Sequence, residues 1–350
     1  MSADLPDAIA SPAEAPYAGL TPHAVLDALD AAGLRGDGRL LQLNSYENRV
    51  FQVGLDEGPP VVAKFYRPAR WSDAQILEEH AFALELAEAE VPAVAPRVLE
   101  PAEPAPEGLV LQGQPATLAR FETWRFAVWP RCGGRTPELD QPGTLEWIGR
   151  FLGRLHAVGA RRPFTHRTAR VAVEPARQAR DWLADQPMLD EPQRGPWLAT
   201  ADAALDKVQA CFAQVPRQQT LRLHGDCHIG NLLWTEAGPH FVDLDDACTG
   251  PAVQDLWMLL SGEREEMTQQ LRQLLAGYRT MRDFDLRELR LIEALRTLRI
   301  LHHSVWIARR WADPAFPVAF TGFASPAYWQ QQTMLLREQL RAMDEEPLAL

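Results

Sequence analysis

The sequence is poor in cysteine, has no long apolar segment and carries no excess of positive charge. Its four cysteines show no paired spacing, so we expect reduced thiols rather than disulfides at Cys132, Cys211, Cys227 and Cys248. No uninterrupted apolar run approaches the roughly twenty residues that a membrane-spanning helix needs. The net charge of −12 and the pI near 5.3 argue against nonspecific binding to nucleic acid or to an anionic membrane. We therefore expect a soluble, cytoplasmic protein with neither of these partners.

The composition is that of a folded protein of substantial size. The 350 residues are 46% hydrophobic and 23% charged, which is enough for one large domain or for two lobes with sizeable cores. Residues 1–20 contain acidic residues and prolines instead of a basic stretch followed by an apolar core. This pattern predicts a flexible tail and not a signal peptide.

The most informative segment is the stretch from His224 to Asn231, with the sequence HGDCHIGN. Within it Asp226 precedes Asn231 by five residues, and Asp243 follows after twelve more. Phosphoryl transfer needs such a set of groups. One carboxylate orients the attacking hydroxyl and accepts its proton, while an amide oxygen and another carboxylate hold Mg²⁺ against the phosphates. The spacing predicts these roles for the three residues.

The residues between Asn231 and Asp243 read as two short strands joined by a turn. Residues 232–234 and 240–242 are largely apolar, and the segment between them contains Gly238. Such a hairpin would bring Asn231 and Asp243 to the same end, where they could share a cation.

Two other interpretations of this segment are possible. Asp and Asn are common in turns, so each alone would more often be structural. His224, Cys227 and His228 could also suggest zinc, but aligning two imidazoles four residues apart needs a helix, and the glycines of the segment argue against one. We expect His224 to be a packed residue that supports the loop.

The N-terminal part reads as a β-meander followed by a helix. A helix opens at Thr21-Pro22, and strands are predicted at 40–43, 50–53 and 61–65, the last containing Lys64. A helix then runs from Ser72 to Leu86. Kinase-type phosphotransferases hold a strand lysine with a helix glutamate. Glu79 shares a face with Leu86 seven residues later, so we favour it over Glu78, which is expected to face solvent together with Glu85.

The remainder is predicted to be mostly helical. A proline-dense loop covers 91–115, and strand 126–130 is either the connection between two lobes or an ordinary strand-to-helix turn. Apolar residues at helical spacing then predict helices at 145–158, 177–184, 197–215, 254–260, 265–278, 286–311 and 327–343.

Several of these stretches together resemble one known family. They are LNSYENRVFQV (43–53), VVAKFYRPARW (61–71), ILEEH (76–80), RLHGDCHIGNLLW (222–234), FVDLDDACTGPAVQDLWMLL (241–260) and RRWADPAFP (309–317). From about Thr21 to Pro347 the chain resembles the bacterial stress response kinase A family, a branch of the aminoglycoside and choline phosphotransferase clan with a protein-kinase-like fold. The resemblance implies a cytosolic, monomeric, ATP- and Mg²⁺-dependent Ser/Thr protein kinase that acts in stress response.

Carried over by position, the resemblance implies a role for each site residue. Asp226 is similar to the proton acceptor, and Asn231 and Asp243 to the Mg²⁺ ligands, with Asp243 also counted as catalytic. Ser45 and Lys64 are similar to the residues that contact ATP.

The chain departs from the wider kinase pattern in two places. It lacks a G-x-G-x-x-G loop, so side chains such as Ser45 and Asn48 would have to supply donors over the phosphates. The triplet Asp243-Leu244-Asp245 lacks the glycine of the kinase pattern D-F-G. We expect Asp245 and Asp246 to be turn or supporting residues rather than ligands. We expect Asp255 to lie buried near a helix start, where it accepts N–H bonds from the catalytic loop and supports the site.

These observations predict an α+β, two-lobed, protein-kinase-like fold. The N-terminal lobe, a β-meander with one helix, would span 21–130, and the larger helical lobe would span 131–350. The main alternative is a phosphotransferase for a small alcohol such as an aminoglycoside, choline or homoserine, because the same catalytic groups serve both reactions. A catalytically silent nucleotide-binding scaffold is disfavoured because Lys64, Asp226, Asn231 and Asp243 are all present.

Overall fold

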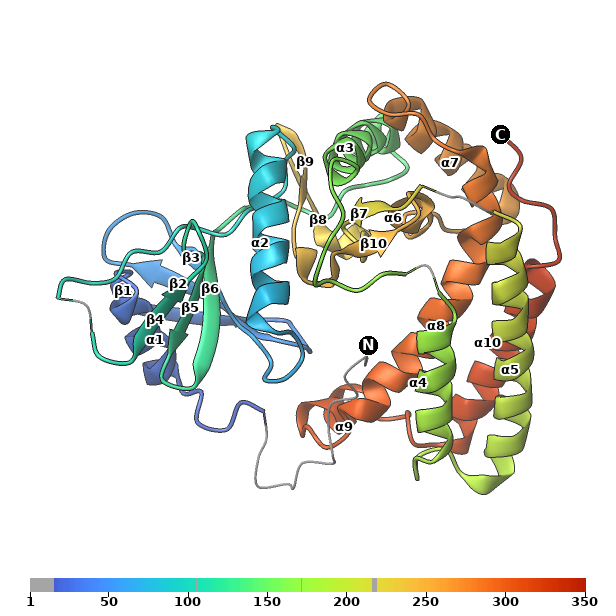
Figure 1. The fold of residues 1–350 in the computed structure, drawn as a ribbon, viewed down its shortest axis with the longest axis horizontal. Coiled ribbons are helices and arrows are strands. Elements are labelled where there is room, and N and C mark those ends of the chain that lie inside the picture. The colour runs from blue at the N-terminus through green and yellow to red at the C-terminus, as the bar shows by residue number, and fades with distance from the viewer. Residues whose placement is uncertain (1–15, 105, 171, 216–218) are drawn as a thin grey trace. The chain divides into compact units, whose positions relative to one another are not determined.

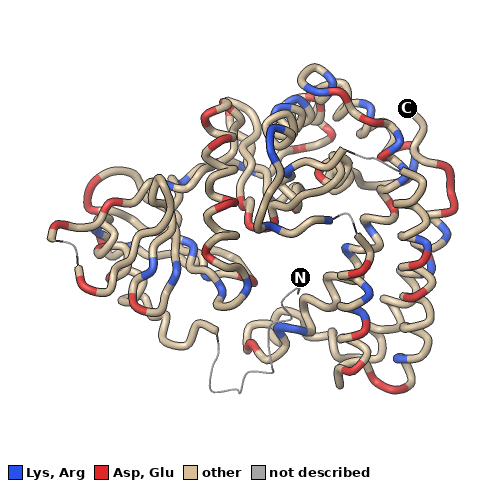
Figure 2. The backbone as a smooth tube through the Cα atoms, viewed as in Figure 1, with Lys and Arg blue, Asp and Glu red and all other residues tan. Residues whose placement is uncertain are grey.

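The structure is a computed structural model that describes residues 16–104, 106–170, 172–215 and 219–350 (Figure 1). The chain forms two compact units. The sheet unit comprises the residues up to Glu138 together with Phe164–Arg167 and Ile229–Ala247. The helical unit comprises Leu139–Pro163, Thr168–His228 and Cys248–Leu350. Acidic residues are spread over both units rather than gathered in one segment (Figure 2).

The sheet unit is built on one antiparallel sheet of six strands in the order β1-β2-β3-β6-β5-β4. The strands are β1 (Gly36–Leu43), β2 (Arg49–Leu55), β3 (Val61–Phe65), β4 (Leu109–Gln112), β5 (Leu118–Phe121) and β6 (Trp124–Pro130). The expected meander of three strands is present as β1 to β3. Because β6 pairs with β3, the proline-rich segment before it returns to the sheet as the short strands β4 and β5. The expectation of a continuous loop over 91–115 was therefore wrong.

Each face of this sheet is covered by one helix. Helix α1 (Pro22–Ala31) is capped by Thr21 and packs its Val25 and Leu29 into the same core as Phe65. Helix α2 (Asp73–Glu88) begins with a capping box of Ser72 and Gln75 and packs Ile76 into a cluster with Tyr66, Leu118 and Ala127. Side chains alternate along a strand, so Lys64 points away from the core that contains its neighbour Phe65.

The hairpin that follows the HGDCHIGN segment belongs to the sheet unit. Strands β8 (Leu232–Thr235) and β9 (Gly238–Phe241) pair antiparallel, with Leu232 opposite Phe241, which confirms the predicted hairpin. The 3-10 turns η1 (Ile229–Asn231) and η2 (Leu244–Asp246) flank it, and Val242 N–H donates to Asn231 O at 3.1 Å. Phe241 also exchanges backbone hydrogen bonds with Pro92 and Val94. These bonds attach residues 229–247 to the sheet unit.

The helical unit holds a separate apolar core. Its elements are α3 (Thr144–Gly159), α4 (Glu174–Ala184), α5 (Glu191–Ala213), β7 (Leu221–Leu223), β10 (Cys248–Gly250), α6 (Val253–Trp257), α7 (Arg264–Tyr278), η3 (Leu286–Leu291), α8 (Ile292–Arg309), α9 (Ala315–Ala319) and α10 (Pro326–Ala342). Helices α5, α8 and α10 pack together around Trp197 and Trp329 (Figure 1). None of the helices in the described part of the chain has both the length and the apolar character needed to cross a membrane.

Two other expectations concern the ends of elements. Helix α5 begins at Glu191 rather than at Trp197, because Asp190 opens it and Pro196 is tolerated inside it. The expected tail, 1–20, lies mostly outside the described residues. Near its end, Tyr17 stacks on Trp124, and the guanidinium of Arg49 lies 4.4 Å from the Tyr17 ring centroid.

Candidate active site

Lys64, on β3, is paired with Asp243 in this structure. Its Nζ donates to Oδ1 of Asp243 at 2.7 Å and lies 4.0 Å from Oδ1 of Asp245. Lys64 is only 7% exposed. Burial alone would lower the pKa of its ammonium, but the charges of Asp243, Asp245 and Glu79 outweigh burial and raise the pKa above its usual value. Lys64 is therefore a fixed positive charge beside the end of the β8–β9 hairpin.

Glu79 lies on the buried face of α2, as the sequence predicts, but Lys64 donates to Asp243 instead of to it. Glu79 is 2% exposed, and its Oε2 has no hydrogen-bond partner among the described residues. Burial raises the pKa of its carboxyl to about 7, against the opposing charges of Lys64 and Arg167. Ionising a buried carboxyl is costly, so near neutral pH Glu79 carries a proton part of the time.

Glu78 does not face solvent as expected. Its carboxylate accepts three successive backbone N–H groups, those of Thr165, His166 and Arg167, the last two at 2.8 Å. Residues 164–167 are thereby joined to α2.

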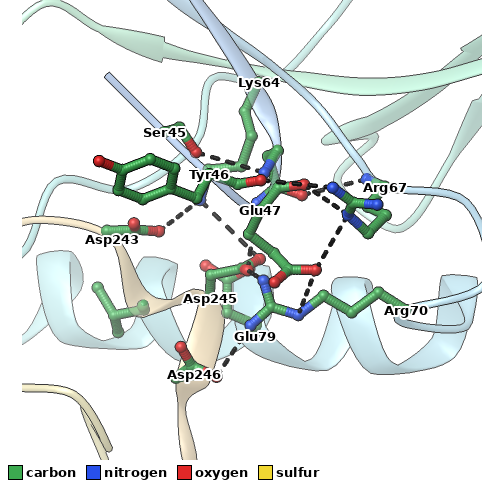
Figure 3. Close-up of polar contacts among 12 residues, drawn as sticks. Ser45, Tyr46, Glu47, Lys64, Arg67, Arg70, Glu79, Asp243, Asp245 and Asp246 are labelled. Atoms are coloured by element: carbon green, nitrogen blue, oxygen red, sulfur yellow. Dashed lines mark hydrogen bonds and ion pairs between the residues drawn. The ribbon is translucent and has the colours of Figure 1, made fainter. Parts of the chain in front are cut away.

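The turn after Asp243 is held by an arginine. Asp243 adopts a left-handed conformation with φ 60° and ψ 67°, which a residue other than glycine keeps only when its surroundings fix it. Arg70 supplies this support, since its Nη1 donates to Oδ2 of Asp245 at 2.6 Å and its Nη2 to Oδ1 of Asp246 at 2.9 Å (Figure 3). Asp245 and Asp246 thus bind protein cations.

A second arginine holds the backbone of the same turn. The Arg167 side chain is buried, donates to the carbonyl oxygens of Ala247, Leu244 and Asp245, and lies over the Trp71 ring at 4.3 Å. One arginine therefore binds the carboxylates of the turn and the other binds its carbonyls.

The loop between β1 and β2 is closed by side chains instead of by glycines. Ser45 Oγ accepts from Asn48 N–H at 3.3 Å, which forms a local turn. Asn48 donates to Oδ2 of Asp245 at 3.2 Å, while Glu47 lies within 3.7 Å of Arg70 Nε. Figure 3 shows the carboxylate of Glu47 pointing toward Arg70, which binds Asp245 and Asp246 of the turn. The loop between β1 and β2 lacks the glycine-rich pattern, and side-chain bonds attach it to the turn at the end of the hairpin.

The open end of the hairpin offers oxygen ligands of the kind that a hard cation takes. The Asp243 side chain is 51% exposed in spite of its bond to Lys64, and the Asn231 backbone is bonded to the residue before Asp243. Carboxylate, amide and phosphate oxygens together with water make a typical Mg²⁺ environment. In the described part of the chain, no three His, Cys, Asp or Glu side chains could hold a metal by themselves. The donor set therefore fits a cation that takes its other ligands from phosphates and water.

In the helical unit, Asp226 lies between two potential cations. Arg299 Nη1, on α8, donates to its Oδ1, and His228 Nε2 lies 3.4 Å from its Oδ2. Burial would raise the pKa of the Asp226 carboxyl, but the hydrogen bond from His228 and the charge of Arg299 outweigh burial and hold the pKa well below its usual range. Asp226 is consequently an ionised carboxylate over the physiological pH range.

Asp255 fixes the backbone just before Asp226. This fully buried residue of α6 accepts the N–H groups of His224 and Gly225, both at 2.8 Å, and its Oδ2 lies 3.1 Å from His156 Nε2. Burial would raise the pKa of Asp255, but these partners outweigh burial and lower it. Asp255 thus supports this loop through backbone N–H groups.

Three arginines of the site were not found from the sequence. Arg70 and Arg167 support the turn after Asp243, and Arg299 binds Asp226. Arg70 lies within VVAKFYRPARW, one of the stretches that resemble the family, and this resemblance could have pointed to it. Arg299 lies in an ordinary amphipathic helix, and its sequence gave no signal of a functional role.

Taken separately, each unit presents part of the chemistry of phosphoryl transfer. The sheet unit carries a lysine, oxygen groups that would suit a cation and a loop closed by side chains, and the helical unit carries an ionised aspartate bound by Arg299. The model of the phosphotransferase enzyme family, called APH, matches residues 39–292. The chain belongs to the phosphotransferase enzyme family. It is accordingly a phosphotransferase of the kinase type.

Similar proteins confirm the resemblance to stress response kinase A. The protein of that name from Salmonella choleraesuis (strain SC-B67) is 44% identical over 331 residues, which cover 95% of this chain and 96% of that protein. Stress response kinase A of Escherichia coli (strain K12) is 42% identical with the same coverage. The Salmonella typhimurium protein named Serine/threonine protein kinase RdoA is 43% identical, again with this coverage.

Solved structures confirm the kinase-like fold. Amicoumacin kinase hAmiN, solved with AMP-PNP, Ca²⁺ and Ami, aligns with a TM-score of 0.67 at 18% identity and covers 93% of this chain and 94% of its own. A microcompartment-associated aminopropanol kinase aligns with a TM-score of 0.64 at 17% identity and covers 92% and 98%. At these identities the likeness shows the fold alone.

Proposed function

We propose that the protein is an ATP- and Mg²⁺-dependent Ser/Thr protein kinase that acts in a stress response. The observation that carries the proposal is the 43% identity, over 95% of the chain, to a protein named as a serine/threonine protein kinase. The groups that the transfer needs are all at the motif positions: Lys64, Asp226, Asn231 and Asp243. The proposal also takes the enzyme to be cytoplasmic and monomeric.

In the proposed reaction, the acceptor hydroxyl approaches the γ-phosphorus of ATP in line with the bond that breaks. A bond forms from the hydroxyl oxygen to that phosphorus, and the bond to the oxygen bridging the β- and γ-phosphorus atoms breaks, which releases ADP. The hydroxyl proton passes to Asp226. Because the pKa of this carboxyl is low, its main contribution is to orient the hydroxyl rather than to act as a strong base.

The sheet unit would bind the phosphates. Asn231 and Asp243 would hold Mg²⁺, which neutralises phosphate charge when bound. Lys64 would grip phosphate oxygens, and Ser45 and the backbone of its loop would donate to them. Glu79 would balance the charge of Lys64 when phosphates displace Asp243 from it.

The second candidate function is a small-molecule phosphotransferase. The same catalytic groups would serve it, and the net charge of −12 would suit a cationic amino alcohol. Net charge describes the whole surface rather than one site, so the sequence relationship has more weight.

A competition assay distinguishes the two functions. Purified protein is incubated with Mg²⁺ and γ-labelled ATP in the presence of a generic Ser/Thr-containing protein, and separately with aminoglycosides, choline and homoserine. The proposal expects label in protein. Turnover of a small alcohol with kcat/KM of about 10⁴ M⁻¹s⁻¹ or more, with proteins unlabelled, would contradict it.

A further inference from the structure

Both carboxylate oxygens of Asp226 face nitrogen groups of the helical unit. Arg299 Nη1 donates to one oxygen, and His228 Nε2 lies 3.4 Å from the other. The Asp226 side chain is 21% exposed and the Arg299 side chain 44% exposed. A molecule that brings a hydroxyl to Asp226 therefore meets a guanidinium that is more accessible than the carboxylate.

The position of Arg299 follows from the pattern of α8. Leu295 and Leu298 are buried in the helical unit, while Arg299 falls on the exposed side of the helix. His303 lies one turn further along on the same exposed side of the helix. The surface of α8 next to Asp226 thus presents an accessible guanidinium, whereas the chain as a whole is strongly acidic.

This charge has a chemical consequence for the acceptor. The charges of Asp226 and Arg299 cancel, so an ammonium group brought to this position finds no net negative charge. It is also repelled by the exposed guanidinium. A carboxylate is attracted. Arginine has five N–H donors in a planar fork, so Arg299 can keep Nη1 on Asp226 and donate from its other nitrogens to a ligand.

We propose that Arg299 is a specificity residue that selects an acceptor hydroxyl flanked by carboxylates, as in a Ser or Thr within an acidic protein segment. The inference rests on the proposed function, because it takes Asp226 to be the group that receives the acceptor hydroxyl. It adds the charge of the acceptor, which neither the family nor the relatives' names specify. Asp226 receives the proton as in the proposed reaction, and Arg299 neither gains nor loses one.

The test is a pair of peptides that differ only in the residues around one serine, with Asp and Glu in one and Lys and Arg in the other. Wild-type protein, Arg299→Ala, Arg299→Lys and Arg299→Glu are compared by kcat/KM for each peptide, with Arg287→Ala as the control. Arg287 is an exposed arginine of the same unit that pairs with Asp285, so its loss removes one charge without changing Asp226.

The wild type is expected to prefer the acidic peptide by about tenfold to a hundredfold, mainly through KM, and raised salt should reduce this preference. Arg299→Ala should lose the preference, Arg299→Lys should keep most of it, and Arg299→Glu should reverse it. Arg287→Ala should match the wild type. The ratio between the peptides is the decisive quantity, because a purely structural role would change both rates together.

Two results would overturn the inference. A wild type that phosphorylates both peptides equally would show that the acceptor is not selected by charge. A change of equal size for both peptides in Arg299→Ala, whether a loss or a gain, would show that Arg299 only holds or blocks Asp226. In either case the proposed function would stand, because peptide phosphorylation itself is observed. Absence of transfer to any protein or peptide would instead contradict the proposed function.

Discussion

The ammonium of Lys64 lies 2.7 Å from Oδ1 of Asp243, on the strand and on the hairpin end that are proposed to hold ATP phosphates and Mg²⁺. Glu79 is buried nearby with one carboxylate oxygen unpartnered among the described residues. Lys64 and Asp243, the aspartate proposed to bind the metal, therefore neutralise each other in this structure. In the proposed function, incoming phosphates would compete with Asp243 for Lys64, and the bound cation would replace Lys64 as the partner of Asp243.

Glu79→Gln should stabilise the protein above neutral pH. The pKa of Glu79 is raised from an ordinary 4.5 to about 7 by burial. The folded state then holds a proton that the unfolded state releases, so stability is lost as pH rises from about 4.5 through 7. Glutamine removes this loss. By chemical denaturation, the variant should equal the wild type near pH 4 and exceed it by up to about 3 kcal/mol at pH 8.

The control for this change is Glu57→Gln, in the exposed turn between β2 and β3. It should leave the pH profile of stability unchanged. If the free energy of unfolding changed with pH in the same way in the wild type and in Glu79→Gln, the pKa of Glu79 would not be raised by folding, which would contradict the prediction.

Arg70→Met should destabilise the fold and weaken ATP binding together. Asp245 is 4% exposed, and removing Arg70 leaves its charge without its closest cation. Breaking a buried ion pair costs about 3–5 kcal/mol. Denaturant unfolding and nucleotide titration measure the two effects. Adding Asp245→Asn should recover part of the stability, and a loss below about 1 kcal/mol in Arg70→Met would mean that the turn does not depend on Arg70.

Asp243→Ala should abolish the Mg²⁺ dependence of ATP binding, and Asn231→Ala should weaken it less. A carboxylate offers a full charge to a hard cation, whereas an amide offers a dipole. ATP affinity is measured by titration with and without Mg²⁺. Since Asp243→Ala also frees Lys64, some metal-independent binding should remain. Undiminished Mg²⁺ dependence of ATP binding in Asp243→Ala would show that the cation does not bind at the end of the hairpin.

The scarcity of lysine allows a chemical test of the nucleotide site. Lys64 and Lys207 are the only lysines in the sequence. An acyl-phosphate derivative of ATP, which acylates lysines beside bound phosphates, should label Lys64, and excess Mg²⁺ and ATP should suppress the labelling. Lys207 lies on α5 and pairs with Asp344, so any labelling of it should be insensitive to ATP. Mass spectrometry locates the label, and ATP-protected labelling of Lys207 alone would place the phosphates elsewhere.

Local patterns explain what could be predicted. The hairpin, the N-cap at Thr21, the helix start at Ser72 and the buried face of α2 each follow from residues close together in the chain. Strands β4 and β5 have four residues each and lie among prolines, so only their pairing with β6 defines them.

The support of the site could not be predicted because it joins distant residues. Arg70 and Asp245 are 175 positions apart, and Arg299 and Asp226 are 73 apart. No spacing rule identifies such partners. The choice of Asp243 over Glu79 as the partner of Lys64 depends on burial, which raises the cost of ionising Glu79 and is set only by the packed fold.

The central claim is that Asp226 receives the acceptor hydroxyl in an ATP-dependent transfer. The direct measurement is the phosphorylation rate of wild type and Asp226→Asn on one protein acceptor in a quenched assay, with ATP affinity measured in parallel. Asparagine keeps the size of the side chain but removes its charge, so the rate should fall by about 10²–10⁴-fold while ATP affinity stays within a few-fold. Phosphorylation at the wild-type rate by Asp226→Asn would contradict the account.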